Sequence, residues 1–572
     1  MAGGLLNIVI NGSQDLYLTG TPEITHFKVI YRRYTNFSTE SMRVSLEDTV
    51  GFGIKSHVVL PRIGDLISKT YLEIVVPEVA IKRELDYQEI SNATIIYNQS
   101  LDILHRINVY MNVNISAYRA VNDVYIAEND ITINDMRTAI QNVFNNVTIG
   151  STSTQTNAHN DFASILANNP IYDMSEVDLL NLAETVPINT TKDSFFKMIQ
   201  SAVNKSYSVQ QYYENIAFEN KKNLDDASNP NYKFAWVKRL GHAIIDYITV
   251  YIGGQEIDKH YGDWINIWWE LTHNIYQEEN YFKMIGDVKE LTSFDRNTKP
   301  SYVIQVPLNF WFSRFSGWAL PLLAMEYHDI SLEVKFKSAD VCAYIENTGE
   351  GDISVSDLFE NNDIFIESSL LIDYVYLDGP ERRKFAQSAH EYLIDQVKYI
   401  SIDNINIPRV PIILDFNHPC KEIIWVIQKQ SYMENLDGHT ETQLCNYKTL
   451  YGKNPLKDGM LELNGHERIA KIDGAYFNYV RPYCSHKDIP DTGINLYSFA
   501  LVPEENQPSG SCNFSRLSKT LLTLDLEPSV FTDTISDPSG NNIINDLVNI
   551  RVYAVIHNVL RIIGGMGALA FS

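Results

Sequence analysis

Residues 365–396 constrain the fold of this chain more than any other stretch. Residues 365–378 are rich in β-branched and aromatic side chains, which is typical of a strand. Asp378-Gly379-Pro380 ends that strand, because proline cannot donate a ladder hydrogen bond but suits the first turn of a helix. The next residues, 381–396, are predicted to form a helix that joins two β-rich halves. One face of this linker helix would carry Phe385, Ala389, Tyr392, Leu393 and Gln396.

The length and composition predict a globular protein with more than one domain. A chain of 572 residues is too long for a single hydrophobic core. With 45% hydrophobic and 20% charged residues it does not have the composition of a disordered chain, and its 34 Tyr and 24 Phe favour sheet over helix. The formal net charge of −25 argues against direct nucleic-acid binding, which requires clustered Lys and Arg.

The cysteines and the hydrophobic runs exclude further classes. The five cysteines are far apart and form no Cys-x-x-Cys pair, so we expect reduced, buried thiols and no zinc ribbon or disulfide framework. They are Cys342, Cys420, Cys445, Cys484 and Cys512. The first residues lack the basic and apolar regions of a signal peptide, and no run of about 18 uncharged apolar residues could span a membrane.

The first half is predicted to begin with an arm and three strands. Residues 1–26 contain many turn residues and predict an extended arm, in which 14–20 are apolar enough to dock. Strands are expected at 27–46, 54–60 and 66–76. The basic residues of the first strand have two open interpretations, a solvated edge that discourages stray pairing or a subunit contact. They are Lys28, Arg32, Arg33 and Arg43.

Residues 77–235 depart from this strand pattern and predict an insertion on the surface. Residues 98–121 and parts of 173–213 have helical spacing, whereas 150–160 are polar and predict a loop. Strand alternation returns after the insertion, with a turn at Gly253-Gly254. A short helix follows with an aromatic face, for which we favour core packing over a ligand platform. That face consists of Trp264, Ile267, Trp268 and Leu271.

The second half, from about residue 397, also has strand texture. Asn464-Gly465 predicts a tight hairpin, because both residues tolerate the positive φ of such a turn. Residues 552–560 are predicted to be the last strand.

Several segments, in order along the chain, resemble a known family, the major capsid proteins of nucleocytoplasmic large DNA viruses, which include chlorella viruses and mimivirus. The resemblance is dense over 1–76, 234–400 and 411–572 and weak over the insertion. The segments that carry it are 3–5, 15–20, 24–37, 64–67, 236–258, 303–312, 320–330, 419–428, 493–501, 507–516 and 564–569.

The resemblance implies a mainly β fold of two tandem eight-stranded antiparallel jelly rolls, with a helical and loop insertion in the first. The implied domains are an arm at 1–26, a first jelly roll at 27–380 with the insertion at about 77–235, the linker helix at 381–396, and a second jelly roll at 397–572. A jelly roll of this kind protects sheet edges without full closure of a barrel.

The resemblance also implies a function in assembly. Homotrimers would form pseudo-hexameric capsomers that tile the icosahedral shell of a large double-stranded DNA virus, assembled in the host cytoplasm. The partners would be further copies of the chain and minor capsid proteins, with surface glycans and only indirect contact with an inner membrane. The arm would lie beneath the shell and the insertion would contribute to its outer crown.

The sequence offers no catalytic, cofactor-binding or metal-binding residues, so we expect no enzyme and no cofactor. His390-Glu391 and His466-Glu467 lack the second histidine of a zinc-protease helix, and no phosphate-binding or nucleophile motif occurs. Nine Asn-x-Ser/Thr sequons are interpreted as chance matches: Asn11, Asn36, Asn92, Asn98, Asn114, Asn146, Asn189, Asn204 and Asn513. Three alternatives stay open: a scaffold of immature particles, a glycan-binding attachment protein, and a jelly-roll enzyme.

Overall fold

The computed structural model describes most of the chain. The described residues are 21–23, 26–29, 31–46, 50–83, 85–127, 131–146, 148–149, 153–154, 162–165, 177–345, 367–433, 444–449, 451–533 and 544–571. The predicted docking segment of the arm, 14–20, and most of the predicted loop at 150–160 lie outside these residues.

The first half forms two facing antiparallel sheets. One sheet has the order β1 (Phe37–Ser45), β13 (Glu367–Leu377), β3 (Leu66–Val76) and β10 (Leu320–Pro321), and β9 (Tyr302–Pro307) also pairs with β3. The other has the order β2 (Lys55–Val59), β11 (Ile330–Phe336), β7 (Ile245–Ile252) and β8 (Gln255–Tyr261). Alternate residues of β11 are buried, which directs one face of its sheet into a core between the two sheets.

The second half repeats this strand order. One sheet runs β14 (His390–Ile405), β24 (Val548–Ile563), β16 (Pro419–Lys429) and β19 (Ile494–Ser498), with β20 (Cys512–Asn513) beside β16 and β25 (Met566–Leu569) beside β24. The other runs β15 (Arg409–Ile413), β21 (Thr520–Leu526), β17 (Leu456–Leu463) and β18 (His466–Asp473). In both halves the first strand pairs with a strand near the end of that half, so the chain forms two tandem jelly rolls, as predicted.

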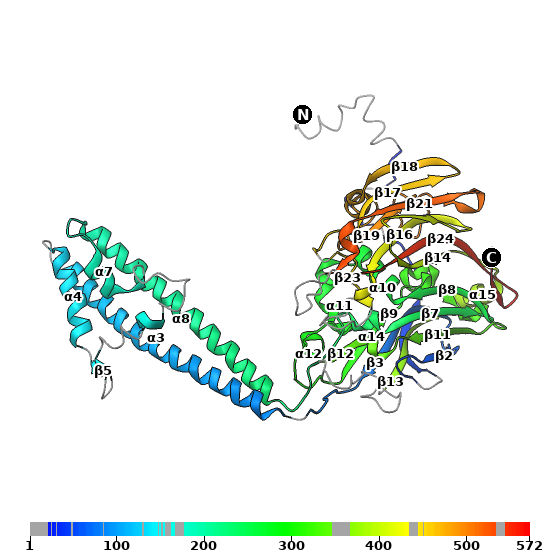
Figure 1. Ribbon diagram of the computed structural model, residues 1–572. Coiled ribbons are helices and arrows are strands. Elements are labelled where there is room, and N and C mark those ends of the chain that lie inside the picture. The colour runs from blue at the N-terminus through cyan, green and yellow to red at the C-terminus, as the bar shows by residue number, and fades with distance from the viewer. Residues whose placement is uncertain are drawn as a thin grey trace, which may run out of the picture.

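The insertion is a long helical hairpin. Helices α3 (Tyr87–Ala127) and α8 (Lys192–Ser228) run side by side away from the rolls, and α4 (Ile133–Asn146) and α7 (Leu179–Thr185) lie at their far end (Figure 1). This end has its own hydrophobic core, separate from the core of either roll. The two ends of the insertion meet where Arg83 N donates to Pro230 O at 2.8 Å, so the whole hairpin leaves the first roll at one place.

Shorter elements complete the fold. Four short strands pair as β6 (Phe234–Trp236) with β12 (Ala343–Ile345) and β22 (Thr532–Asp533) with β23 (Ile544–Asn545); β4 (Thr148–Ile149) pairs with β5 (Ser153–Thr154). The remaining α-helices are α9 (Leu240–Ala243), α10 (Gly262–Thr272), α11 (Glu278–Met284), α12 (Lys289–Thr292), α13 (Trp311–Arg314), α14 (Ala339–Cys342), α15 (Gly379–Gln387), α16 (Gln430–Met433) and α17 (Arg481–Ser485). Helical turns of other types are η1 (Ile275–Gln277), η2 (Ser316–Trp318), η3 (Leu322–Ala324), η5 (Tyr476–Val480), η6 (Phe514–Arg516) and η7 (Pro528–Val530).

The predicted linker helix at 381–396 is wrong in its second part. Helix α15 ends at Gln387, and Ser388 already has extended backbone with φ −89° and ψ 146°. From His390 the chain is strand β14, whose residues pair with β24 beginning at His390 opposite Ile562. The hydrogen-bond ladder to a partner more than 150 residues away overrides the local helical spacing.

Two other predicted strand limits are also corrected. The strand predicted at 27–46 begins only at Phe37, because its partner β13 ends opposite it at Leu377 and the preceding residues have no strand to pair with among the described residues. The strand predicted at 552–560 lies within β24 and is not the last one. A tight turn at Gly564-Gly565, with φ of 60° and 83°, leads into β25.

The predicted hairpin at Asn464-Gly465 allows a test of backbone conformation. A Cβ at Gly465 would meet no atom within 4 Å, but Gly465 has φ +79°. Gly465→Ala should therefore lower the free energy of unfolding by about 1 kcal/mol through backbone strain alone. Gly379→Ala is the matched control, because its added Cβ also has open space and a positive φ is not required there. Urea unfolding measures the free energy of unfolding of both variants, and Gly465→Ala should be the less stable of the two. Equal stability would contradict a role for the positive φ of Gly465.

Candidate functional site

The junction between the two rolls is built around helix α10. Its aromatic face packs against strands of the second roll in a hydrophobic cluster distinct from the core of either roll. Trp264 is fully buried, and its ring lies 5.3 Å from that of Tyr553 on β24. The predicted packing role of this face is confirmed, but the core it enters lies between the halves. The cluster contains Trp264, Ile267, Trp268, Leu271, Val397, Ile424, Val426, Tyr447, Ile494, Leu496, Tyr553 and Val555.

Polar contacts also cross the junction. The Val397 backbone N donates to Asp258 Oδ1 at 2.9 Å, and the Gln396 amide donates to the Ile257 carbonyl. Arg551 of β24 pairs with Asp263 of α10 at 3.2 Å. Directional bonds of this kind, added to apolar burial, fix the orientation of one roll relative to the other.

A buried carboxylate at the junction collects cations from both rolls. Asp395 on β14 accepts from Lys421 at 3.0 Å, lies 3.1 Å from His557, and lies 3.8 Å from Arg314 of the first roll. Burial raises the pKa of Asp395, but the neighbouring His557 imidazole and the charge of Lys421 outweigh it, so the pKa is lowered overall. Arg314 also lies 4.0 Å above the ring of Trp268. A charged Asp395 therefore ties the first roll to the second.

His486 is a second buried ionic centre, within the second roll. Its Nε2 lies 2.7 Å from Glu422 and its Nδ1 lies 3.1 Å from Glu504. Burial by itself lowers the pKa of the imidazole, but the two carboxylates raise it to about 9. His486 therefore carries a proton at neutral pH and neutralises part of the buried negative charge.

The segment that precedes β1, residues 27–29 and 31–36, and the edge strand β1 itself present exposed side chains. Lys28, Arg32 and Arg33 are exposed, while Arg43 on β1 pairs with Glu73 at 2.5 Å. The same segment exposes apolar side chains, with Phe27 99% and Tyr34 85% exposed. Exposed aromatic side chains in an extended segment favour a subunit or partner contact over a solvated edge, although the basic residues alone fit either.

The cysteines differ in their exposure to solvent. Cys342 and Cys420 are buried free thiols, and burial raises the pKa of Cys342 to about 12. Cys484 is exposed, so the prediction of buried thiols is wrong for that residue.

The glycosylation sequons differ in their exposure. Asn114 is buried in the hairpin core, where a glycan could not be attached to the folded chain. Exposed sequon residues are Asn36, Asn92, Asn98, Asn189, Asn204 and Asn513.

The described residues contain neither a metal-binding cluster nor a membrane-spanning helix. Within them, no group of three or more His, Cys, Asp or Glu side chains is arranged to hold a metal ion. Within the same ranges, no helix combines the length and hydropathy needed to cross a membrane.

The ionic centre at His486 predicts a pH dependence. Because its folded pKa of about 9 lies above the ordinary 6.5, its stabilising effect is complete below about pH 6.5 and is lost as the pH rises through 9. Wild type should lose roughly 3 kcal/mol of unfolding free energy between about pH 7 and pH 10 that His486→Gln does not lose. Denaturant unfolding at both pH values measures this difference.

The matched control is His466→Gln on the exposed surface of β18. It should keep the wild-type pH dependence. Equal losses in wild type and His486→Gln would contradict the assigned ion pairs.

Comparison with known proteins gives matches along nearly the whole chain. The model of "Major capsid protein N-terminus" matches residues 25–167 and 192–378, and the model of "Large eukaryotic DNA virus major capsid protein" matches residues 381–568. The chain is 29% identical to the major capsid protein of Pyramimonas orientalis virus over 597 residues and 26% identical to that of Paramecium bursaria Chlorella virus 1 over 603 residues. Both alignments cover 100% of each chain.

Solved structures support the same fold. The PBCV-1 virus capsid model has a TM-score of 0.58 at 23% identity and covers 96% of this chain and 100% of its own. The Faustovirus major capsid protein has a TM-score of 0.54 at 10% identity and covers 96% of this chain and 94% of its own. At these identities the matches establish the double jelly roll.

Proposed function

The chain belongs to the large eukaryotic DNA virus major capsid protein family and is a structural protein of the virion capsid, and on that premise we propose that it forms homotrimeric, pseudo-hexameric capsomers. These capsomers tile the icosahedral shell of a large double-stranded DNA virus. Assembly takes place in the host cytoplasm, and the chain acts by binding its own copies and has no catalytic role.

The duplicated jelly roll is the observation that carries this proposal. The two rolls have the same strand order and are joined by a buried junction, so one chain supplies two similar blocks in a fixed orientation. Three such chains around a three-fold axis place six similar rolls in a ring, which gives a nearly six-sided outline. A head-to-tail contact between the second roll of one copy and the first roll of the next closes this ring.

Exposed apolar side chains on the rolls support such a contact. A cluster on η5, α17 and the following loop includes Tyr483, which is 75% exposed, and Val480, which is 48% exposed. Tyr479 and Ile489 belong to the same stretch and are also exposed. Stable interfaces commonly bury about 1,600 Å² around an apolar centre, and we assign this cluster to the contact with the next copy.

The arm and the helical hairpin have other roles in this proposal. The arm at 1–26 and the exposed aromatic residues that follow it, such as Phe27 and Tyr34, contact neighbouring capsomers or minor capsid proteins beneath the shell. The hairpin reaches away from the rolls (Figure 1), which suits a place in the outer crown, where surface glycans could be attached. Contact with an inner membrane is indirect.

The mass of the purified protein in solution tests the trimer. Light scattering after size exclusion should give about three times 65.3 kDa. A double variant, Val480→Asp with Tyr483→Asp, should shift the mass toward 65.3 kDa, because two buried charges without partners oppose the contact. Phe218→Asp, on an exposed hairpin residue, is the matched control and should leave the trimer intact. A wild type that stays monomeric at high concentration would contradict the proposal.

Removal of the hairpin separates its role from that of the rolls. Because Arg83 and Pro230 are hydrogen-bonded neighbours, residues 84–229 can be replaced by two glycines that join them. The shortened chain should remain trimeric, with a melting temperature of the rolls changed by less than about 4 °C. Scattering and calorimetry measure both. Conversion to monomers would instead assign the subunit contact to the hairpin.

A further inference from the structure

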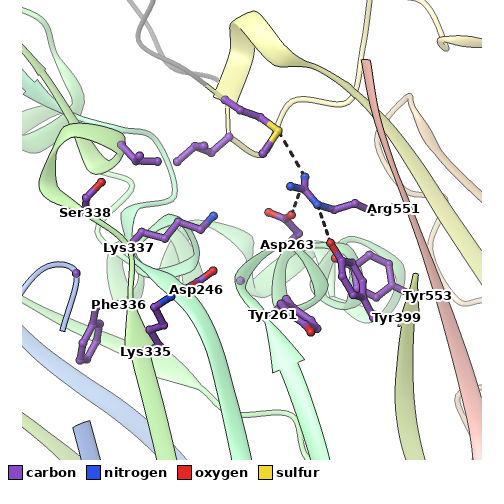
Figure 2. A pocket seen from close by; sticks show the side chains of 15 residues that line it. Asp246, Tyr261, Asp263, Lys335, Phe336, Lys337, Ser338, Tyr399, Arg551 and Tyr553 are labelled. Carbon is purple, nitrogen blue, oxygen red and sulfur yellow. Dashed lines mark hydrogen bonds and ion pairs between the residues drawn. The ribbon is translucent and has the colours of Figure 1, made fainter. Parts of the chain in front are cut away.

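A cavity of about 490 Å³ lies at the junction and is lined by both rolls. Lys337, Ser338 and Asp263 line it from the first roll, and Tyr399, Arg551 and Tyr553 line it from the second. Figure 2 shows Lys337 and Arg551 extending toward the same space from opposite sides. The junction contacts described above do not account for this cavity.

Lys337 supplies an uncompensated positive charge to the cavity. It follows directly after β11, and its side chain is only partly exposed. Among the described residues, its ammonium group has neither an ion-pair nor a hydrogen-bond partner, whereas nearby Lys335 pairs with Asp246 at 3.1 Å. An ammonium partly withdrawn from water without an anion is unfavourable, and a bound anion would remove that cost.

Arg551 has a free donor toward the same space. Its Nη1 lies 3.2 Å from Asp263 and donates to Gln428 at 3.1 Å, and its Nε donates to Tyr399 at 3.2 Å. Within the described part of the chain, its Nη2 makes no hydrogen bond. Asp263 balances the charge of Arg551 as Asp246 balances that of Lys335, so the charge of Lys337 remains.

Tyr553 adds a buried donor without an acceptor. Its side chain is fully buried and lines the cavity, and its hydroxyl makes no hydrogen bond to any residue that the structure describes. Buried hydroxyl groups are normally paired, because an unpaired one loses its hydration without compensation. A hydroxyl, an ammonium and a guanidinium donor around one cavity match the acceptor oxygens of an oxyanion.

We propose that this cavity binds a phosphate group, held between Lys337 of the first roll and Arg551 of the second, with the Tyr553 hydroxyl as a further donor. The bound anion bridges the two rolls and strengthens their junction. This site is independent of the shell-forming role, because a capsid protein without it would still present the same outer surfaces.

Isothermal titration with inorganic phosphate tests the site on the full-length protein, in phosphate-free buffer at constant ionic strength. Wild type should bind one phosphate per chain saturably. Lys337→Met should raise the dissociation constant about tenfold or more, and Tyr553→Phe should raise it by a smaller factor. Lys457→Met, at an exposed lysine on β17, is the matched control and should bind as wild type does.

A parallel titration with adenosine monophosphate separates two sources of the same group. Tighter binding of the nucleotide would support a phosphate monoester as the occupant, and equal or weaker binding would support free phosphate. Phosphate should also raise the melting temperature of wild type more than that of Lys337→Met. The circular dichroism spectra of Lys337→Met and Tyr553→Phe should match that of wild type, which shows that both variants are folded. Absence of saturable binding to wild type, or unchanged affinity of Lys337→Met, would overturn the proposal.

Discussion

Burial of Trp264 and Trp268 of α10 against β16 and β24 is the interaction on which the architecture depends. Each jelly roll has a core between its two sheets, and the core of the first roll also takes in Ile394, Leu560 and Ile562 of the second. The junction determines the angle between the rolls, and a shell made of repeated blocks requires that angle to be the same in every copy. Apolar burial alone is non-directional, so it would permit rolls to slide over one another. The hydrogen bonds to Asp258 and Ile257 remove that freedom.

The charges buried beside this interface also help to fix the angle between the two rolls. A buried ion pair contributes little net stability, since removal of water from both charges offsets their attraction. Its geometric requirement is strict, however, because each charge must meet its partner. Asp395 meets cations from both rolls, so a displaced roll would leave buried charge unpaired. The protein thus uses apolar contact for adhesion and ionic contact for orientation.

Sequence patterns predicted much of the fold, and their failures have physical causes. The strand at Leu66–Val76 was predicted at its observed limits, because alternation and a Pro-Gly turn are local signals. The linker helix extended too far, because the pairing of β14 with β24 cannot be read locally. The aromatic face of α10 was assigned to packing, but no pattern told which roll it would meet. Glu422, His486 and Glu504 gave no signal at all, since only folding brings them together.

The hairpin enters and leaves the first roll through adjacent residues, Lys82 and Asn231, which are themselves bridged. An inserted segment whose two ends lie side by side imposes no strain on the sheets of the first roll, whatever its length. Natural selection can therefore lengthen, shorten or exchange this segment while the two sheets of the first roll and the junction between the rolls keep their geometry.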